Sequence, residues 1–599
     1  MMDNDRGLQN MINRRQFVGL TGMVGATALA GCTGNSDDGS SKGDSGNKNV
    51  HDVKHVDMAN QVPQNIQWNI SNPSSAAQIS HYYLFDAFAK YNYAKSKLVP
   101  YGITDWEFGD NTFKLTLRDG LTWANGDDVT ADDIVTQLKL GMYTGSGYGD
   151  YTKSVEAKDD KTVVMHLENQ VNKSIVKFQV LSDNQIRQPK SVFGKYVDKI
   201  EKNEKDGTRA LQDFAWKEPI ASGPFEFKQA TTQELVLTRR DDHPDSKNIN
   251  FKTYAFRYIN GNEQAHQSMI ANQLDSVYSM FTPPRIVNQL PKNWQQVKTP
   301  ANWGYGLVPQ MDHKHTGDRA VRQAIAYVIN RDAVVKNAAP ESKQAPKYSI
   351  GIPSGDQERI LGDSASKFET YGQASSETDK AAKVLKKAGY KKQGGKWHDS
   401  DGDVVNLPVQ VPSDWTDWVT AAQTIVDQLK SFGFKSSVDS RSYGTLSGQV
   451  WANGDFVLAS GSWLPGGAQA SFPYFSLRYQ LLENSGYTYN YPPANQSRGG
   501  KHADAKVPSR TGSGKMTINP AKRLQELSQA TDEKKINEII LDLAWVTNQD
   551  LPILAVAEKQ DQSFLSRDHW EVPEDGSDIE QVKWPESWAV RFGKNNYKP

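Results

Sequence analysis

The stretch from residue 111 to residue 140 limits the fold most, because it fixes a strand, two turns and a helix within one short segment. Apolar and polar residues alternate from 113 to 118, which is the period of a half-buried strand. Asp119-Gly120 and Asn125-Gly126 then supply turns, since glycine accepts the positive φ that tight turns need.

A helix is expected to begin at the end of this stretch. Thr130 stands three positions before Asp133, the spacing of a capping box in which the two side chains satisfy two free backbone amides. Ile134, Val135 and Leu138 follow at helical spacing and give the helix an apolar stripe. No catalytic group is apparent in this segment.

Length and composition narrow the class of protein. The chain has 599 residues, too many for a single core. Its net charge of -1 leaves no basic footprint for nucleic acid. The supply of 15 Trp, 24 Tyr and 21 Phe can fill cores and can also form platforms for flat or sugar-like ligands. A single cysteine excludes internal disulfides.

Residues 1–32 are expected to be a targeting segment. Arg14 and Arg15 resemble a twin-arginine export signal, and residues 17–30 form an apolar region too short to span a membrane. This region leads to Cys32 in a sequence that resembles a lipobox, so we expect lipid on Cys32 and a body anchored outside the cytoplasmic membrane by that lipid alone. A buried structural cysteine fits poorly, because its neighbours cannot form a core. Residues 33–50 read as a flexible tether without a core.

Hydrophobic period and breakers predict further elements along the chain. The expected strands are 66–70, 162–167, 225–228, 234–238, 251–259, 434–438, 456–459 and one beginning at 551. The expected helices are 81–88, 264–274, 318–335, 379–389, 418–432 and 536–546. Residues 484–519 are rich in Gly, Pro, Ser and Asn and read as an irregular surface insert.

Enzyme and metal motifs are absent or fail on inspection. The chain has no H-E-x-x-H, G-x-S-x-G or C-x-x-C sequence. The run 512–515 is similar to part of a P-loop, but Ser509 replaces its first glycine and Met516 its Ser or Thr. The aspartate run 399–403 lacks the glycine and the glutamate of a calcium loop and predicts a hairpin turn.

Two histidine pairs require an interpretation. His51 and His55 are four residues apart, and His313 and His315 flank a lysine. Solvated surface histidines are the expectation for both pairs, and no metal site is predicted.

Three segments carry a family resemblance. LRDGLTWANGDDVTADDI (117–134), ASGPF (221–225) and DRAVRQAIAYVINRDAVV (318–335) resemble signatures of the family 5 extracellular solute-binding proteins of ABC transporters, the peptide, nickel and oligosaccharide group. Arg319 and Arg322 in the third segment are expected to be solvated or ion-paired rather than to bind ligand.

The resemblance implies an α/β fold with two lobes of the periplasmic-binding-protein type (type II, large cluster), an extra domain and mixed sheets around a hinged interlobe cleft. On this pattern lobe I would comprise 51–74, 218–305 and 551–599. The extra domain would be 75–217 and lobe II 306–550. The chain would be a monomer without cofactor or catalytic activity that delivers its ligand to an ABC permease and its ATPase subunits.

The ligand class stays open between peptides and two alternatives. Peptide-binding members place an aspartate just after the cleft tryptophan, whereas Trp463 is followed by residues 464–469 without a carboxylate. Peptide is favoured on family frequency, and an oligosaccharide or a nickel complex is the alternative. A surface hydrolase or a ligand-sensing module would be a different class. The expected cleft residues are Trp463, Trp415, Trp303, Tyr443, Tyr82 and Asn72, each of which could instead be a core aromatic or a turn residue.

Overall fold

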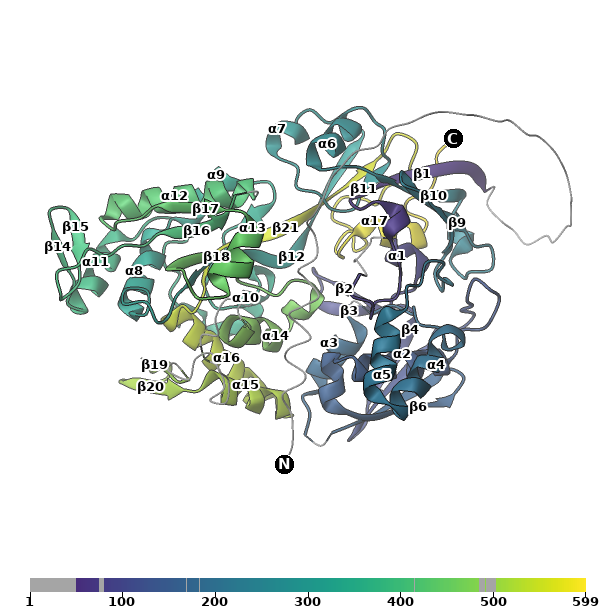
Figure 1. The fold of residues 1–599 in the computed structure, drawn as a ribbon, viewed down its shortest axis with the longest axis horizontal. Coiled ribbons are helices and arrows are strands. Elements are labelled where there is room, and N and C mark those ends of the chain that lie inside the picture. The colour runs from purple at the N-terminus through teal and green to yellow at the C-terminus, as the bar shows by residue number, and fades with distance from the viewer. Residues whose placement is uncertain are drawn as a thin grey trace, which may run out of the picture.

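A computed structural model describes residues 50–74, 80–168, 170–182, 184–413, 415–483, 491 and 503–599. The twin-arginine segment, Cys32 and nearly all of the predicted tether lie outside these residues. Two lobes lie side by side. Lobe II is on the left in Figure 1, and lobe I is on the right with the extra domain beneath it. This architecture confirms the predicted two-lobed α/β fold.

Lobe I is built on a four-stranded sheet with the order β1-β10-β9-β8. The first strand runs parallel to β10, and the other neighbours are antiparallel. The sheet strands are β1 (His51–Ala59), β8 (Phe225–Ala230), β9 (Glu234–Arg239) and β10 (Phe251–Tyr258). Around them lie α6 (Asn262–Ile270), α7 (Pro284–Val287) and α17 (Pro585–Arg591). The elements α1 (His81–Leu84), β2 (Ala89–Asn92) and β3 (Lys97–Pro100) lead into the extra domain, whose core includes Ala89 of β2.

The extra domain contains an antiparallel sheet with the order β4-β5-β7-β6. Its elements are β4 (Ile103–Phe108), β5 (Thr112–Leu117), α2 (Ala131–Tyr143), β6 (Thr152–Asp159), β7 (Thr162–Leu167), α3 (Lys173–Leu181), α4 (Lys190–Lys202) and α5 (Glu204–Asp213). Leu115 of the sheet and Ile134 of α2 share one buried core. The predicted capping box of Thr130 and Asp133 is present at the start of α2.

Lobe II contains most of a second, mixed sheet with the order β11-β21-β12-β18-β16-β17, in which β13 also pairs with β21. The strands are β11 (Ser276–Val277), β12 (Trp294–Pro309), β13 (Lys343–Gln344), β16 (Val409–Pro412), β17 (Val438–Arg441), β18 (Leu458–Ser462) and β21 (Leu554–Ser566). Leu307, Ile325, Val409 and Ile425 represent the core between this sheet and its helices.

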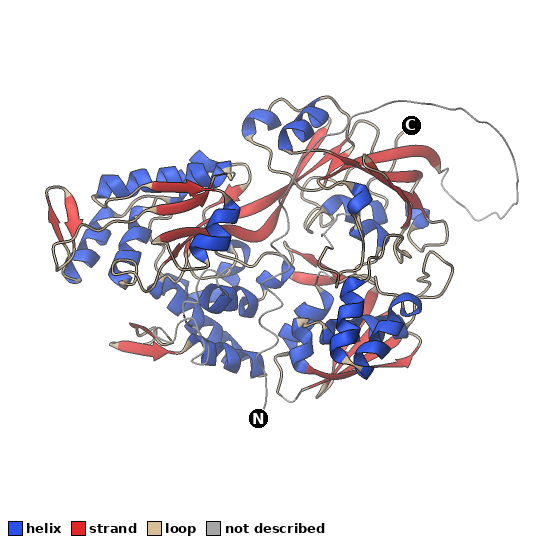
Figure 2. Cartoon of the chain, viewed as in Figure 1, coloured by secondary structure: helices blue, strands red, loops and turns tan. Residues whose placement is uncertain are grey.

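The remaining elements of lobe II cover this core or extend from it (Figure 2). The helices are α8 (Arg319–Val328), α9 (Arg331–Ala338), α10 (Ser354–Leu361), α11 (Thr378–Lys387), α12 (Thr416–Phe432), α13 (Tyr443–Thr445), α14 (Pro473–Arg478), α15 (Pro520–Gln529) and α16 (Glu533–Asp550). Two hairpins are formed by β14 (Lys391–Gln393) with β15 (Lys396–His398) and by β19 (Ala505–Pro508) with β20 (Lys515–Ile518). The turn at 512–515 thus leads into a strand and not into the helix that a P-loop requires.

Two predictions about the start of the body were wrong. Residues 66–70 are not a strand, because the side chain of Gln67 accepts from the Asn69 N–H at 2.8 Å and that of Asn69 donates to Leu211 O at 2.7 Å. The first strand is instead β1, whose histidines and aspartates concealed the strand pattern.

Two predicted helices are shorter than expected. The helix at 81–88 ends at Leu84, and Phe85 already has extended backbone. The helix at 318–335 is divided in two, since the Asn330 side chain accepts from the Ala333 N–H at 3.0 Å and caps a second helix. Asp318 caps the first helix as predicted.

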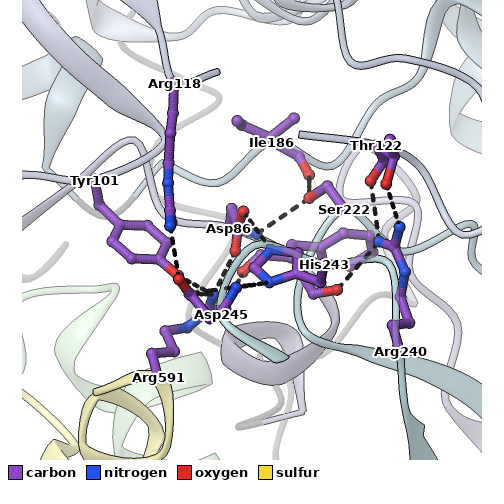
Figure 3. Close-up of polar contacts among 12 residues, drawn as sticks. Asp86, Tyr101, Arg118, Thr122, Ile186, Ser222, Arg240, His243, Asp245 and Arg591 are labelled. Carbon is purple, nitrogen blue, oxygen red and sulfur yellow. Dashed lines mark hydrogen bonds and ion pairs between the residues drawn. The ribbon is translucent and has the colours of Figure 1, made fainter. Parts of the chain in front are cut away.

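A buried polar network ties lobe I to the extra domain and to α17 (Figure 3). Asp86 accepts from Arg591 and contacts His243 Nε2 at 3.0 Å. Burial opposes the charge of Asp86, but the interactions with His243 and Arg591 prevail and lower its pKa to about 2. Arg591 also donates to Tyr101 at 2.7 Å and to Tyr82 O at 2.8 Å. This network fixes the position of α17.

Arg118 and Arg240 extend the same network into the first two family-like segments. Arg118 pairs with Asp245 at 2.7 Å, and Arg240 donates to Ala221 O at 3.0 Å and to Thr122 Oγ1 at 2.7 Å. Both family-like segments therefore contribute to the joint between lobe I and the extra domain.

Candidate functional site

The strands β12 and β21 connect the two lobes and pair with each other along most of their length. Their antiparallel register runs from Trp294 opposite Ser566 to Leu307 opposite Leu554, and it shifts between Pro300 and Gly304. One end of this ladder adjoins β11, and the other adjoins β18. The irregularity in the middle marks the crossing between the lobes, where a hinge is expected to bend.

Trp463 packs against the crossing strands. Its ring has no exposed surface, and its Nε1 donates to Ala557 O of β21 at 2.8 Å. Gly304 of β12 lies directly against this contact, because a Cβ atom there would be 2.1 Å from Ala557 O and 2.7 Å from Trp463 Nε1. In this conformation Trp463 holds the crossing strands together, and a role in ligand contact stays a prediction.

The segment that follows Trp463 also packs on the crossing. Asn302, which has a left-handed backbone with φ of 51°, donates from Nδ2 to Gly467 O and to Ser471 Oγ, both at 3.0 Å. Gly467 N–H donates to Ala301 O at 3.3 Å. The segment 464–469 therefore packs on the hinge through Gly467 and stabilises it.

Three of the predicted site residues come together on lobe II. Trp303 and Trp415 both pack against Trp418, with ring centroids 5.2 and 4.9 Å apart. Tyr443 stacks on Trp415 at 4.9 Å. Trp303, Trp415 and Tyr443 are half-buried, whereas Trp418 is buried. We call these four residues the aromatic face; whether they contact ligand stays a prediction.

Charged residues join the aromatic face to lobe I. Lys343 pairs with Asp417 of α12 at 2.5 Å, and its ammonium lies 5.3 Å from the ring of Phe281 in lobe I. Burial lowers the pKa of Lys343. Lys559 lies 5.9 Å from the Trp303 ring and 3.7 Å from Asp561 on the same strand.

Tyr82 belongs to an aromatic group on lobe I. It packs edge-on against Trp584 at 5.0 Å, and Trp584 packs edge-on against Tyr278 at 5.7 Å. The ammonium of Lys90 lies 4.1 Å from the Tyr82 ring. All three aromatic rings are half-buried. We call Tyr82, Tyr278 and Trp584 the lobe I rim.

Buried carboxylates lie next to the rim and on the crossing strand, and the sequence did not single them out. Burial raises the pKa of Asp57 to about 7 and that of Glu558 to about 7, and it raises the pKa of Glu586 well above its usual value. Glu558 accepts from the Ser354 N–H at 2.8 Å. Such perturbed acids mark functional sites more often than ordinary surface acids do.

The sequence matches a known protein family. The profile of the bacterial extracellular solute-binding proteins, family 5, matches residues 97–481, which is more than half of the chain. The chain belongs to this family. Family 5 members are substrate-binding proteins of transport systems, and the match confirms the predicted family.

The family 5 chain resembles a curated relative over part of its length. It is 25% identical over 264 residues to the oligopeptide-binding protein OppA of Bacillus subtilis (strain 168), a match that covers 41% of this chain and 46% of the relative. The chain thus matches slightly less than half of that relative's length.

Solved structures share the fold over nearly the whole chain. An oligopeptide ABC transporter periplasmic oligopeptide-binding protein from Thermotoga maritima superposes with a TM-score of 0.70 at 19% identity, over 90% of this chain and 98% of that one. A mannohexaose-bound structure of the Thermotoga protein gives 0.64 at 18% identity, over 92% and 98% of the two chains. At such low identity these structures show the fold alone.

Asn72 lies in a turn of this family 5 chain and not with the aromatic residues above. Its Nδ2 donates to Phe214 O at 3.2 Å, and its Oδ1 accepts from the Ser74 N–H at 2.8 Å. These bonds give Asn72 a structural place at the junction with the extra domain, and ligand contact stays a prediction.

The expectation of solvated histidines was wrong for two of the four residues. His55 is fully buried on β1, contacts Ser276 Oγ at 2.9 Å and stacks on Tyr254. His315 is buried and contacts Asp399 at 3.1 Å. Among the described residues, no group of three or more His, Cys, Asp and Glu side chains could hold a metal ion.

The aspartate run 399–403 forms a turn, as predicted, and a lysine neutralises it. Lys314 lies 2.7 Å from Asp399 and 2.6 Å from Asp403. Arg322 is buried rather than solvated, and it pairs with Asp550 at 2.6 Å. Both clusters are accounted for by ion pairing.

A cavity of about 390 Å³ lies on lobe II away from the crossing strands. Its lining includes Asn337 of α9, Thr378 of α11 and Gln428 of α12. Its walls hold amides, hydroxyls and one carboxylate on a single lobe, whereas the crossing brings aromatic and charged groups of both lobes together, so we place the candidate site at the interlobe crossing. No helix within the described ranges is long and apolar enough to cross a membrane.

Proposed function

We propose that this family 5 protein binds an oligopeptide-like solute between lobe I and lobe II and delivers it to the permease of an ABC importer. The observation that carries the proposal is the arrangement at the crossing of β12 and β21. There Lys343 of lobe II lies over Phe281 of lobe I, and Lys559 lies between Trp303 of the aromatic face and Asp561, which contacts Ser279 next to the rim residue Tyr278. Apolar surface with a few fixed polar groups is typical of small-molecule sites.

The protein would capture its ligand by closing about the crossing strands. Polar and apolar contacts join the extra domain to lobe II, and Ile175 of α3 lies in a buried cluster with lobe II residues. Asn172 N–H donates to Ser528 O at 2.8 Å, the Tyr151 and Tyr474 hydroxyls are 3.2 Å apart, and the ring of Phe178 stacks on Phe472 at 5.7 Å. These contacts would form in the closed state, and a ligand that touches both lobes would favour that state.

Peptide is the proposed ligand class because relatives of this chain are peptide-binding proteins. The Bacillus relative is named oligopeptide-binding, and one from Lactococcus lactis is named dipeptide-binding. An oligosaccharide is the second candidate, since the Thermotoga structure holds mannohexaose and stacked aromatic rings suit sugars. A nickel complex is a further alternative within the family. A hydrolase or a ligand-sensing module would need another observation.

The same proposal includes export and attachment. Arg14 and Arg15 would direct twin-arginine export, and lipid on Cys32 would anchor the monomer at the outer face of the cytoplasmic membrane. The protein would bind and release its ligand without catalysis, while the ATPase subunits supply energy. Loss of membrane association in Cys32→Ala would support the anchor, and unchanged membrane association would contradict it.

A thermal unfolding screen tests the ligand class. We expect pentapeptides in large excess to raise the Tm of the full-length protein, because a ligand at 100 times its Kd adds about 2.7 kcal/mol of stability. Trp415→Ala should reduce this shift, whereas Trp106→Ala, on β4 of the extra domain, should leave it unchanged. A shift with oligosaccharides or nickel–histidine alone would replace peptide by that class. An equal loss in both variants would contradict the aromatic face as the site.

A further inference from the structure

Helix α17 holds a carboxylate next to the lobe I rim. Arg591 at one end of the helix is fixed by Asp86 and Tyr82 O (Figure 3). At the other end Trp584 has a left-handed backbone with φ of 56°, which is strained in a residue other than glycine. The fold thus holds Trp584 and Glu586 in place from both sides.

Glu586 is buried without a hydrogen-bond partner on either carboxylate oxygen. Its exposed fraction is 0%, and Trp584 Nε1 beside it likewise has no partner. Other buried acids have a partner on at least one oxygen: Asp57 accepts from the Met58 N–H at 2.6 Å, Glu580 from the Gly576 N–H at 2.6 Å and Glu558 from the Ser354 N–H at 2.8 Å. Native proteins seldom leave a buried carboxylate unpaired, because burial removes the water that stabilises its charge, so a partner from outside the chain would satisfy it.

The surroundings of Glu586 are acidic and partly aromatic. Asp57 and Asp561 are close enough for their charges to act on Glu586, and Lys90 is the cation whose charge opposes them. Burial raises the pKa of Tyr278 of the rim, and the negative charges of Asp57, Glu586 and Asp561 also act on it and raise its pKa further. The group therefore favours an added cation.

The same carboxylates continue the candidate site from lobe II. Asp561 contacts Ser279 Oγ at 3.3 Å and Lys559 at 3.7 Å, and Lys559 lies over the Trp303 ring. A ligand that lies on the aromatic face could extend along Lys559 and Asp561 toward the half-exposed lobe I rim, beside Glu586.

We propose that Glu586, supported by Asp57 and Asp561, accepts the protonated amino group of the ligand, and that the free Nε1–H of Trp584 donates to the ligand next to it. This inference rests on the proposed function and narrows the substrate to peptides with a free amino terminus. It supplies the acidic partner that residues 464–469 do not contain.

The test compares two random pentapeptide libraries, one with free amino termini and one N-acetylated, by calorimetric titration of the full-length protein. The wild type should bind the free library about tenfold or more tightly than the acetylated one, as expected for a charge-assisted hydrogen bond. Glu586→Gln should lose this preference, and Glu586→Asp should keep part of it. Glu580→Gln, a buried and partnered acid in the same segment, should behave as wild type.

The outcomes separate the two claims. A wild type that binds both libraries equally, or a Glu586→Gln variant that keeps the preference, overturns the role of Glu586 and leaves peptide binding intact. A wild type that binds neither library overturns the proposed ligand and this inference together. A Glu586→Gln variant that does not fold is replaced by Glu586→Asp, in which an unchanged preference and affinity would count against close contact with the amino group.

Discussion

The aromatic residues predicted for the site fall into two groups at the crossing. Trp463 holds the crossing strands together, whereas the others form half-buried surface. Trp463 was expected in the cleft because of the family resemblance, but the structure buries it against β21. Trp303, Trp415 and Tyr443 were selected by the same reasoning, and they do lie together. The residue types predicted that these rings pack together. Which rings stay half-exposed is decided by contacts between residues that are far apart in the sequence.

The burial of Glu586 could not be predicted from the sequence. Nothing in the run Trp584-Pro585-Glu586 distinguishes it from the many solvated glutamates of the chain. Its burial arises only when α17 packs beside α1 and β21, so the unpaired carboxylate can be found from tertiary structure alone.

The contact between Gly304 and Trp463 gives a prediction at this scale. Gly304→Ala should lower the free energy of unfolding by about 1–3 kcal/mol, because the new methyl group would overlap Ala557 O. Gly355→Ala in α10 is the control, since a Cβ there meets nothing within 4 Å. Urea unfolding of the two variants decides the point. Equal stability of both would show that the crossing is looser than described.

Local signals in the sequence predicted helix ends best where a capping residue marked the end. The capping box of α2 and the left-handed Gly433 that ends α12 are both present. The predicted helix at 318–335 failed in the middle, where Asn330 caps a new helix instead of continuing the first. Hydrophobic period alone cannot show such a break, because both halves bury the same face.

The α2 cap can be tested directly. Thr130→Ala should cost about 1 kcal/mol of stability, because one amide of the first turn loses its partner. Thr232→Ala, at an exposed turn residue, should have little effect. Chemical unfolding followed by circular dichroism measures both. A Thr130→Ala variant as stable as wild type would mean that Asp133 alone sustains the helix start.

At the scale of the whole molecule, the family-like segments predicted the two lobes correctly, while the network that joins them was not foreseen. Asp86, Arg240 and Arg591 come from three distant parts of the chain. Each would be read alone as a solvated charge. Their burial follows from the way the chain returns to lobe I after building lobe II.

Acid should weaken this joint within a defined range of pH. The pKa of Asp86 is lowered to about 2, below the ordinary value of about 3.9, so its contribution is present above about pH 4 and is lost as the pH falls through 2. This shift corresponds to about 2 kcal/mol of stability. Unfolding of Asp86→Asn, measured between pH 5 and 2, should lack this part of the pH dependence, whereas Asp119→Asn, at an exposed turn, should retain it. Identical slopes in all three proteins would contradict the pairing of Asp86.

Closure on a ligand is the central claim, and hydrogen–deuterium exchange at residues 170–176 tests it most directly. Asn172 N–H donates to Ser528 O between the extra domain and lobe II, and it should exchange only when the lobes open. The free-amino pentapeptide library should slow exchange at Asn172 while leaving β5, inside the extra domain, unchanged. Peptide binding with unaltered exchange at Asn172 would contradict closure of the two lobes around the ligand.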